Sequence, residues 1–434
     1  MIRVVFIFLS MLLLDACTIF CIRSAFPLIY TRYRKQFLAW YFFLHLALIA
    51  GVLLGLFSVT PRLLRTVSFV GLFMLYFSKI FTLLAVLPLL AIMGIKKLRT
   101  ESARLPLVVN TTVRTLMPDT QTALLQHTVP AALLEPGLSR SAFIARSGLV
   151  LASLPLISLT AGMVSGVYDY RVHRVKLVLP RLPSAFEGLT IAQISDIHSG
   201  SFYNKRAVSG GIDLLLSLKA DVIFFTGDLV NDRINEMRDY QDIFSRVKAP
   251  LGVFSSLGNH DYGDYVSWPT PAAKAQNLDE LKKVHKLMGY DLLLNEHRRL
   301  KIGRDEIGIL GVENWGALSH FPKYGRVDLA MKDTEELPVK LLLSHDPSHW
   351  QAQVIPRFPE IDAMFSGHTH GMQMGIRAAG FQWSPIQYVY PEWAGLYRHG
   401  HQQLYVNVGY GFLGYPGRVG ILPEITLFTL SAKS

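Results

Sequence analysis

Five short clusters of metal-ligand and acid–base residues recur along the second half of this 434-residue chain. Each cluster follows an apolar run with the length and composition of a buried strand. In order, they are Ser195-Asp196-Ile197-His198, Thr226-Gly227-Asp228, Gly258-Asn259-His260-Asp261, Ser344-His345-Asp346 and Gly367-His368-Thr369-His370-Gly371. Because α/β sheets deliver their chemistry at the carboxyl ends of strands, we expect the five clusters to form one site.

The donor types in these clusters indicate a metal centre. His368 and His370 are two residues apart on an extended segment, so their side chains project from the same side. Neutral imidazole is the commonest metal ligand in proteins. The chain has only two cysteines, Cys17 and Cys21, both in the first apolar run, which excludes a thiolate site or a disulfide framework. Aspartate, asparagine and histidine ligands without thiolate suit manganese, iron or zinc.

The net charge of +11 does not indicate a nucleic-acid partner. Residues 1–169 contain 15 lysines and arginines against 5 acidic residues, whereas residues 170–434 contain 28 against 27. The part of the chain with the ligand clusters therefore lacks the basic excess with which proteins neutralise phosphate backbones.

Residues 189–430 resemble the calcineurin-like metallophosphoesterases. The resemblance rests on the order D-x-H, G-D, G-N-H-D, H and G-H-x-H, every block of which is present. The order of the blocks and the closing Pro423-Glu424-Ile425-Thr426-Leu427 resemble the membrane-associated, YkuE-like branch of that superfamily. The resemblance implies a four-layer α/β sandwich of two mixed sheets flanked by helices, two bound divalent metal ions and a hydrolase of phosphoric esters.

The resemblance also implies a role for each cluster residue. The seven metal ligands fall into three sets: Asp196, His198 and His370 for one ion, Asn259, His345 and His368 for the other, and Asp228 as the bridge. A hydroxide formed between the two ions would attack phosphorus in line, so no protein nucleophile is needed. His260 is the candidate general acid, with Asp261 holding its tautomer, although His260 could instead only orient Asn259.

Four apolar stretches before the clusters are long enough to cross a bilayer as helices: residues 4–22, 37–59, 67–95 and 143–164. We therefore expect a transmembrane region over residues 1–166 and a catalytic domain over residues 167–434. Asp15 and Lys79 fall inside spans, where an unpaired charge is costly. An interhelical contact is the simpler explanation for both residues, and an intramembrane relay is the alternative.

Basic residues predict how the chain lies in the membrane. Four lie in the loop 23–36 and six in the loop 96–141, against three on the other face. Because cytoplasmic loops are enriched in lysine and arginine, both termini should lie outside the cytoplasm. We therefore expect an integral protein of a bacterial inner membrane with an extracytoplasmic catalytic domain.

The sequence thus predicts a membrane-anchored, binuclear phosphoesterase that acts on phosphate mono- or diesters of a lipid-linked substrate. The resemblance implies one alternative, a UDP-2,3-diacylglucosamine pyrophosphatase-type hydrolase of lipid A biosynthesis, whose substrate is made in the cytoplasm. Another is a membrane sensor with a phosphoesterase-like domain.

Three further features bear on how such an enzyme would meet its substrate. Aromatic residues between 381 and 397 could rim the site at the membrane, with Trp393 as the best candidate, or fill the core. The segment 264–271 is a candidate lid. Because about six residues separate the last span from the domain, we expect the site to open toward the membrane plane.

Overall fold

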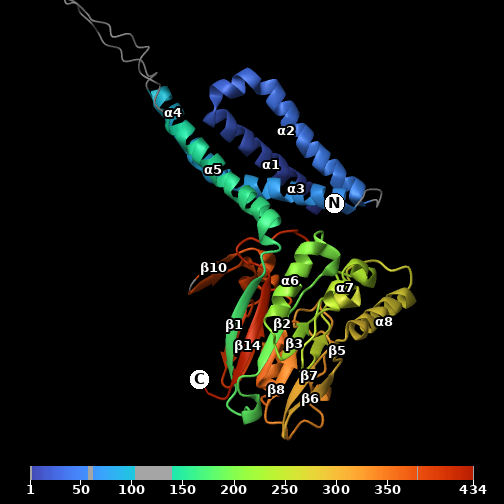
Figure 1. The fold of residues 1–434 in the computed structure, drawn as a ribbon. Coiled ribbons are helices and arrows are strands. Elements are labelled where there is room, and N and C mark those ends of the chain that lie inside the picture. Colours follow the sequence, from blue (N-terminus) through green and yellow to red (C-terminus); the bar gives the residue numbers. More distant parts are fainter. Residues whose placement is uncertain (1, 57–61, 103–138, 379, 434) are drawn as a thin grey trace, which may run out of the picture. The chain divides into compact units, whose positions relative to one another are not determined.

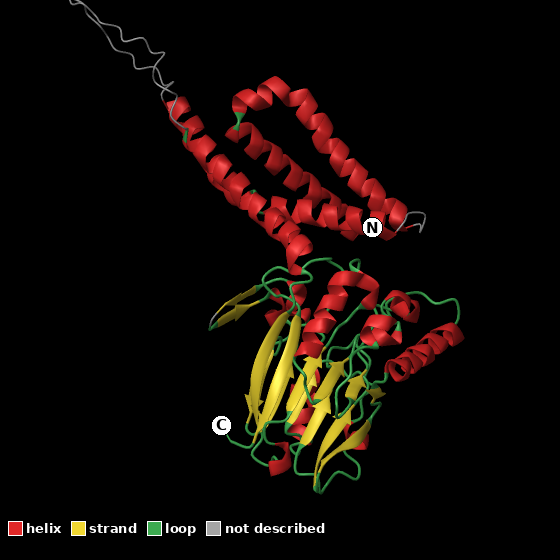
Figure 2. Cartoon of the chain, in the orientation of Figure 1, coloured by secondary structure: helices red, strands yellow, loops and turns green. Residues whose placement is uncertain are grey.

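The computed structural model describes residues 2–56, 62–102, 139–378 and 380–433. The chain divides into two compact units, Met1–Ser158 (unit 1) and Leu159–Ser434 (unit 2). The described part of unit 1 is helical, whereas unit 2 combines strands and helices (Figure 1, Figure 2).

Long apolar helices form the described part of unit 1. They are α1 (Ile2–Ala25), α2 (Pro27–Leu56), α3 (Arg62–Ile80), α4 (Leu83–Ser102) and most of α5 (Arg140–Ala161). Four stretches are long and apolar enough to cross a membrane: Val5–Ala25, Pro27–Gly55, Leu64–Ile92 and Arg140–Gly166. The four predicted apolar spans are therefore confirmed, with different boundaries.

Two boundaries differ for local reasons. The predicted loop 23–36 is almost entirely helical, because Pro27 opens α2 directly after Phe26, and proline suits the first position of a helix. The predicted third span consists of two helices, α3 and α4, with a turn at Phe81 and Thr82. Most of the predicted loop 96–141, residues 103–138, lies outside the described residues.

The two charges predicted inside the spans pair with each other. The ammonium nitrogen of Lys79 on α3 lies 2.5 Å from Oδ1 of Asp15 on α1. Tyr41 on α2 and Tyr76 on α3 donate to the same carboxylate at 2.7 and 2.9 Å. His45 on α2 contacts Lys79 through Nε2. This cluster joins three helices, and it satisfies charges that would be costly if left unpaired in a membrane.

Two six-stranded mixed sheets form the centre of unit 2. The first has the order β1-β14-β2-β3-β4-β5 and the second has the order β12-β13-β9-β8-β7-β6. The strands of the first sheet are β1 (Arg171–Val178), β2 (Thr190–Ile194), β3 (Val222–Thr226), β4 (Val253–Ser256), β5 (Asp291–Leu292) and β14 (Glu424–Ser431). Those of the second are β6 (Glu296–Ile302), β7 (Asp305–Gly311), β8 (Lys340–Leu343), β9 (Ala363–Ser366), β12 (Gly395–His399) and β13 (Gln402–Val406). A separate two-stranded sheet pairs β10 (Ile376–Ala378) with β11 (Phe381–Trp383).

The sheets pack face to face through an apolar layer that includes Ile191, Phe224, Leu341, Phe365 and Phe428. A second apolar cluster joins the outer face of the first sheet to three helices: α6 (Lys205–Ser217), α7 (Gln241–Phe244) and α8 (Pro271–Met288). A third cluster joins the other outer face to α9 (Val327–Ala330) and α10 (Ile355–Arg357). The predicted four-layer sandwich is confirmed.

The strand directions bring the ligand clusters and the close of α5 to one edge of unit 2. β2, β3 and β4 are parallel, so the clusters that follow them lie side by side. β14 is antiparallel to β2 and parallel to β1, so the start of β1 at Arg171 lies beside the carboxyl end of β2. A π-helical turn, Gly162–Gly166, closes α5 four residues before β1. The chain therefore enters unit 2 at the edge where the clusters gather, which we call the catalytic edge.

Candidate metal centre

Five of the seven predicted ligands lie in left-handed backbone just after a strand. Ten residues other than glycine have positive φ in the described chain, and five of them are predicted ligands: Asp196 (51°), His198 (47°), Asp228 (59°), His368 (74°) and His370 (51°). Left-handed backbone costs roughly 1–2 kcal/mol for a residue with a Cβ atom. Such strain gathers at functional sites and persists only where the surroundings hold it. These positions therefore mark one constrained site.

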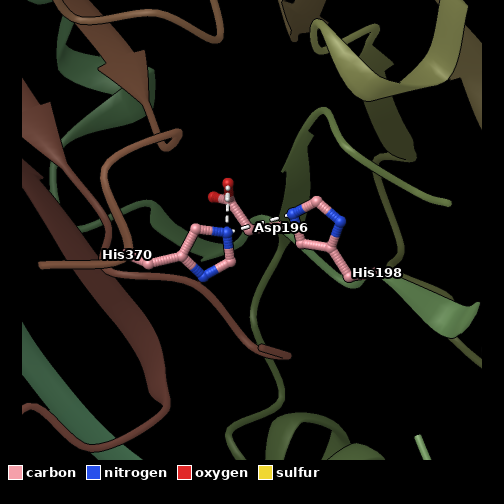
Figure 3. A group of neighbouring side chains, drawn as sticks. All are labelled: Asp196, His198 and His370. Atoms are coloured by element: carbon pink, nitrogen blue, oxygen red, sulfur yellow. Dashed lines mark hydrogen bonds and ion pairs between the residues drawn. The ribbon is translucent and has the colours of Figure 1, made fainter. Parts of the chain in front are cut away.

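Asp196, His198 and His370 form the first group of side chains (Figure 3). The Nε2 atoms of His198 and His370 lie 3.0 Å apart. Nε2 of His370 lies 3.3 Å from Oδ1 of Asp196. All three residues are buried, so two imidazoles that are 172 residues apart turn toward one buried carboxylate.

Asp228 connects this group to a second one. Its Oδ2 lies 3.4 Å from Nε2 of His198 and 3.2 Å from Nε2 of His345. Its Oδ1 accepts the backbone N–H of His260 at 2.9 Å. A carboxylate with one oxygen between the imidazoles of two groups has the placement that the predicted bridging role requires.

Asn259 and His368 complete the second group. Oδ1 of Asn259 lies 2.8 Å from Nδ1 of His368. The rings of His368 and His345 lie 5.2 Å apart, measured between centroids. The seven predicted ligands therefore lie together, and their metal-binding roles stay predictions.

The surroundings of His345 show that this site attracts positive charge. Its Nδ1 lies 2.7 Å from the Thr226 carbonyl and donates to it. Its buried Nε2, which faces Asp228, makes no well-formed hydrogen bond within the described chain. Burial alone would lower the pKa of His345, but Asp228 and Asp196 outweigh it and raise the pKa to about 10. Oxygen and nitrogen donors around two buried carboxylates fit divalent cations of the manganese, iron or zinc class.

Asp261 bonds the backbone around Asp228 and does not contact the ring of His260. Its carboxylate accepts four backbone N–H groups: those of Asp228 at 3.0 Å, Leu229 at 2.8 Å, Val230 at 3.4 Å and Gly258 at 2.9 Å. The predicted contact of Asp261 with the ring of His260 is wrong, because Nδ1 of His260 donates to the Asn231 carbonyl at 2.7 Å. Burial, and next the charge of Asp228, raise the pKa of Asp261 to about 7. Asp261 is therefore a positioning residue for Asp228.

Tyr390 and Asp346 support His368, although neither was among the predicted ligands or acids. The Tyr390 hydroxyl lies 2.8 Å from Nε2 of His368 and donates to Asp346 at 3.4 Å. Asp346 stands next to His345 in the fourth cluster, and that adjacency was the available sequence signal. Trp393, the predicted rim residue, is instead 3% exposed and packs with Tyr390 in a small apolar cluster.

Tyr265 brings a second phenol to the site from the predicted lid segment. Its hydroxyl accepts from the amide nitrogen of Asn259 at 2.8 Å. Its ring lies 4.4 Å from that of His260. Tyr265 is 47% exposed, so it lies between the second group and solvent. The lid function of this segment stays a prediction.

Arg418 is a buried cation that sequence analysis missed. It is 1% exposed, and its guanidinium lies 3.3 Å from Nδ1 of His370. The same group donates to the backbone carbonyls of Val408, Gly409, Gly411 and Ile421. Because a guanidinium has donors only, Nδ1 of His370 is the acceptor. Arg418 therefore fixes the ring with Nε2 turned toward Asp196.

Gln373 holds the strained segment that follows His370. Residues 370–373 are all left-handed, with φ between 51° and 56°. The Gln373 amide nitrogen donates to the carbonyls of Tyr415 at 2.7 Å and Gly417 at 3.1 Å, and its oxygen accepts the N–H of Leu413 at 2.6 Å. The loop 413–418 thus holds the His370 segment through both Gln373 and Arg418.

Two known families match separate parts of the chain. Residues 189–372 match the family described as calcineurin-like phosphoesterase. Residues 1–167 match the family described as the probable transmembrane domain of calcineurin-like phosphoesterases.

Curated relatives bear related names. A transmembrane protein with metallophosphoesterase domain from Danio rerio is 28% identical over 279 residues, which cover 62% of this chain and 59% of the relative. The uncharacterized metallophosphoesterase YkuE of Bacillus subtilis is 28% identical over 266 residues, 60% of this chain and 85% of YkuE. The UDP-2,3-diacylglucosamine pyrophosphatase LpxG of Chlamydia trachomatis is 27% identical over 240 residues, 48% of this chain and 70% of LpxG. The chain thus spans only 59% of the length of the zebrafish protein.

We expect Arg418→Gln to weaken divalent-metal binding by about 10–100-fold, the usual effect of removing a group that orients a ligating histidine. Titration calorimetry of the full chain in detergent with Mn²⁺ measures this. Arg418→Lys, which keeps the charge and a donor, should recover part of the loss. Arg398→Gln, at an exposed position on β12, is the matched control. Unchanged affinity in a folded Arg418→Gln protein would contradict the positioning role.

Proposed function

We propose that the chain is a membrane-anchored phosphoesterase, because residues 189–372 match the calcineurin-like phosphoesterases and residues 1–167 match their transmembrane domain family. It would hydrolyse phosphate mono- or diesters with the help of two divalent metal ions. The observation that carries the proposal is the buried carboxylate of Asp228, placed between the imidazoles of two ligand groups. The complete donor set favours an enzyme over a sensor.

The first ion would be held by Asp196, His198 and His370, and the second by Asn259, His345 and His368, with Asp228 shared. When bound, such ions draw charge from phosphate oxygens and lower the pKa of water. Asp261 and Arg418 keep Asp228 and His370 in place for this task. Preorganised groups of this kind require no rearrangement at the moment of reaction.

His260 is the proposed general acid. The Asn231 carbonyl accepts the proton of its Nδ1, which leaves Nε2 as the atom that gains and loses a proton. The ring lies 5.0 Å from that of His198 and 4.4 Å from that of Tyr265, between the first group and the candidate lid. A protonated Nε2 in this position would deliver its proton to the leaving oxygen.

We further propose a lipid-linked substrate. The chain enters unit 2 at the catalytic edge, only four residues after the helical segment that ends at Gly166. Such a link reaches about 3.5 Å per residue at most, so it keeps this edge close to the end of the span. A phosphate carried by a lipid would reach the site by diffusion within the membrane.

LpxG, one of the relatives, is named as a UDP-2,3-diacylglucosamine pyrophosphatase, and a similar nucleotide-lipid substrate is the second candidate for this chain. The two candidates differ in orientation, because basic residues predict an extracytoplasmic catalytic domain. We expect alkaline phosphatase fused after Ser434 to be active and green fluorescent protein at the same position to be dark. The opposite pair of results would refute the predicted orientation and favour the cytoplasmic substrate.

We expect Asp228→Asn to lower kcat/KM for bis-p-nitrophenyl phosphate by more than about 100-fold, because the bridging charge is lost. The assay uses the full chain in detergent with added Mn²⁺. Asp213→Asn, which alters an exposed ion pair with Arg246, is the matched control and should keep full activity. Activity of Asp228→Asn within a few-fold of that of the unsubstituted chain would refute the bridging role proposed for Asp228.

We expect His260→Ala to slow turnover by about 10²–10⁴-fold with alkyl leaving groups, the range for removing a general acid, and by much less with p-nitrophenolate. The measurement is kcat across diesters of graded leaving-group pKa. Metal content, measured in parallel, should not change. A loss that is the same for every leaving group would remove His260 from the role of acid.

A further inference from the structure

The small β10–β11 sheet has one apolar and one polar face. Its register pairs Ile376 with Trp383 and Ala378 with Phe381, whereas Arg377 pairs with Gln382. Because side chains alternate along a strand and paired residues share a face, the first four form one face. Arg377 and Gln382 form the other.

Both side chains of the polar face bond to the rest of unit 2, with Arg377 partly buried and Gln382 exposed. Arg377 donates to the fully buried Glu424 at 2.7 Å. Gln382 donates to the Ala394 carbonyl at 3.2 Å. On the opposite face, Ile376 is 53% exposed and Phe381 is 57% exposed. An antiparallel sheet in a water-soluble protein normally buries its apolar face and exposes the polar one, so this sheet is inverted.

Exposed apolar residues continue on both sides of the sheet. Met372 precedes it and is 56% exposed, while Tyr388 and Val389 follow it and are 78% and 55% exposed. These three residues, with the four of the apolar face, are called the apolar hairpin surface below. Exposed apolar side chains gathered in one segment of the chain favour an interaction site there.

The apolar hairpin surface belongs to the end of unit 2 that holds the close of α5. Gly375, just before β10, donates its N–H to the Val419 carbonyl at 2.9 Å. Gly162, in the π-helical turn, lies so close to the same residue that a Cβ atom added to it would be 2.7 Å from the Val419 side chain. Val164 in that turn is 81% exposed. Figure 1 shows β10 at this end of unit 2. Arg140–Gly166 is a candidate membrane span, so the position of this face favours a bilayer as the surface that would cover it.

Both ends of the β10–β11 hairpin connect to the segment that carries His370. Its first strand begins six residues after His370, along the left-handed segment that Gln373 holds. After its second strand, Ser384 donates its hydroxyl to the Gly371 carbonyl at 2.8 Å. A surface docked through this hairpin would therefore lie next to the His370 side of the ligand groups.

We propose that the apolar hairpin surface inserts into the membrane interface and presents the metal centre to phosphate groups carried by lipids. Tyrosine and tryptophan suit the headgroup level, and Ile376 and Phe381 suit the acyl boundary below it. The insertion stands on geometry alone, whereas its use in substrate capture rests on the proposed function.

Membrane depth tests the insertion without any need for activity. The full chain is reconstituted into phosphatidylethanolamine–phosphatidylglycerol vesicles, with a nitroxide on Ile376→Cys, Phe381→Cys or Leu287→Cys. Leu287, which is 71% exposed on α8, is the matched control. The chain's own Cys17 and Cys21 are buried, and the unsubstituted chain labelled in parallel provides the background.

We expect labels at 376 and 381 to collide several-fold more with oxygen than with a water-soluble nickel chelate, and the label at 287 to show the reverse. The proposal would be overturned if the nickel chelate collided with the labels at positions 376 and 381 as often as with the label at position 287. Exclusion of both reagents would overturn it too, because it would show that a protein partner or a second copy covers the surface.

A second measurement tests substrate capture. Phe381→Asp should lower kcat/KM for a long-chain lipid phosphoester in vesicles by about tenfold, and leave that for a water-soluble diester unchanged. Leu287→Asp should change neither. An equal loss on both substrates would count against capture. If labels insert but no variant or parent cleaves any phosphoester, the interface stands and the proposed function fails.

Discussion

Two buried carboxylates that face the same space constrain the rest of unit 2. Oxygen atoms of Asp196 and Asp228 and a nitrogen of His345 all lie within 4.8 Å of one another. Like charges so placed repel, and burial raises the free energy of both. Backbone N–H groups offset part of this cost: that of His368 donates to Asp196 at 3.0 Å and that of His260 donates to Asp228 at 2.9 Å. Both sheets end at this edge, which supplies donors from five segments.

The two units handle buried charge in different ways. In unit 1, Asp15 faces the ammonium of Lys79 and two tyrosine hydroxyls, so that site is neutral and hydrogen-bonded without an outside partner. In unit 2, Asp196 and Asp228 face imidazoles, which balance a carboxylate only when they are protonated. The first cluster joins three helices, whereas the second gathers carboxylates and imidazoles that could hold a metal ion.

The loop 413–421 makes the geometry of the metal centre depend on how the chain arrives from α5. Arg418 fixes the His370 ring, while its own backbone N–H donates to the Gly162 carbonyl at 3.1 Å. Tyr415, which bonds Gln373, also donates to the carbonyl of Leu159. A Cβ atom at Gly166 would lie 2.1 Å from the Arg418 carbonyl oxygen, so the approach requires glycine there. The C-terminal end of α5 is therefore part of the structure that holds His370, a predicted metal ligand, in place.

Much of the fold and of the site was predictable from the sequence because its signals are local. Apolar runs of strand length, the residues that follow them and helical stretches of membrane length are each visible within a short window, and no distant contact alters them. The apolar spans and the gathering of the five clusters follow from such signals, whereas the sandwich and the grouping of Asp196 with His198 and His370 were implied by the resemblance to a known family. The features that the sequence did not predict have no such local signal. Arg418 is separated by 48 residues from His370 and resembles any surface arginine in the sequence.

What the amino-acid sequence determined by itself was the kind of chemistry, because residue type and spacing decide which donors exist. The partner that each donor serves depends on the folded structure. Asp261 stands beside His260 in the chain but bonds the backbone of Asp228, and Trp393 is buried while Phe381 is exposed. The inverted face of β10–β11 likewise follows from a pairing register and from the buried carboxylate of Glu424 that draws Arg377 inward. Such choices depend on groups that folding brings together from distant parts of the chain, and no short window of sequence contains them.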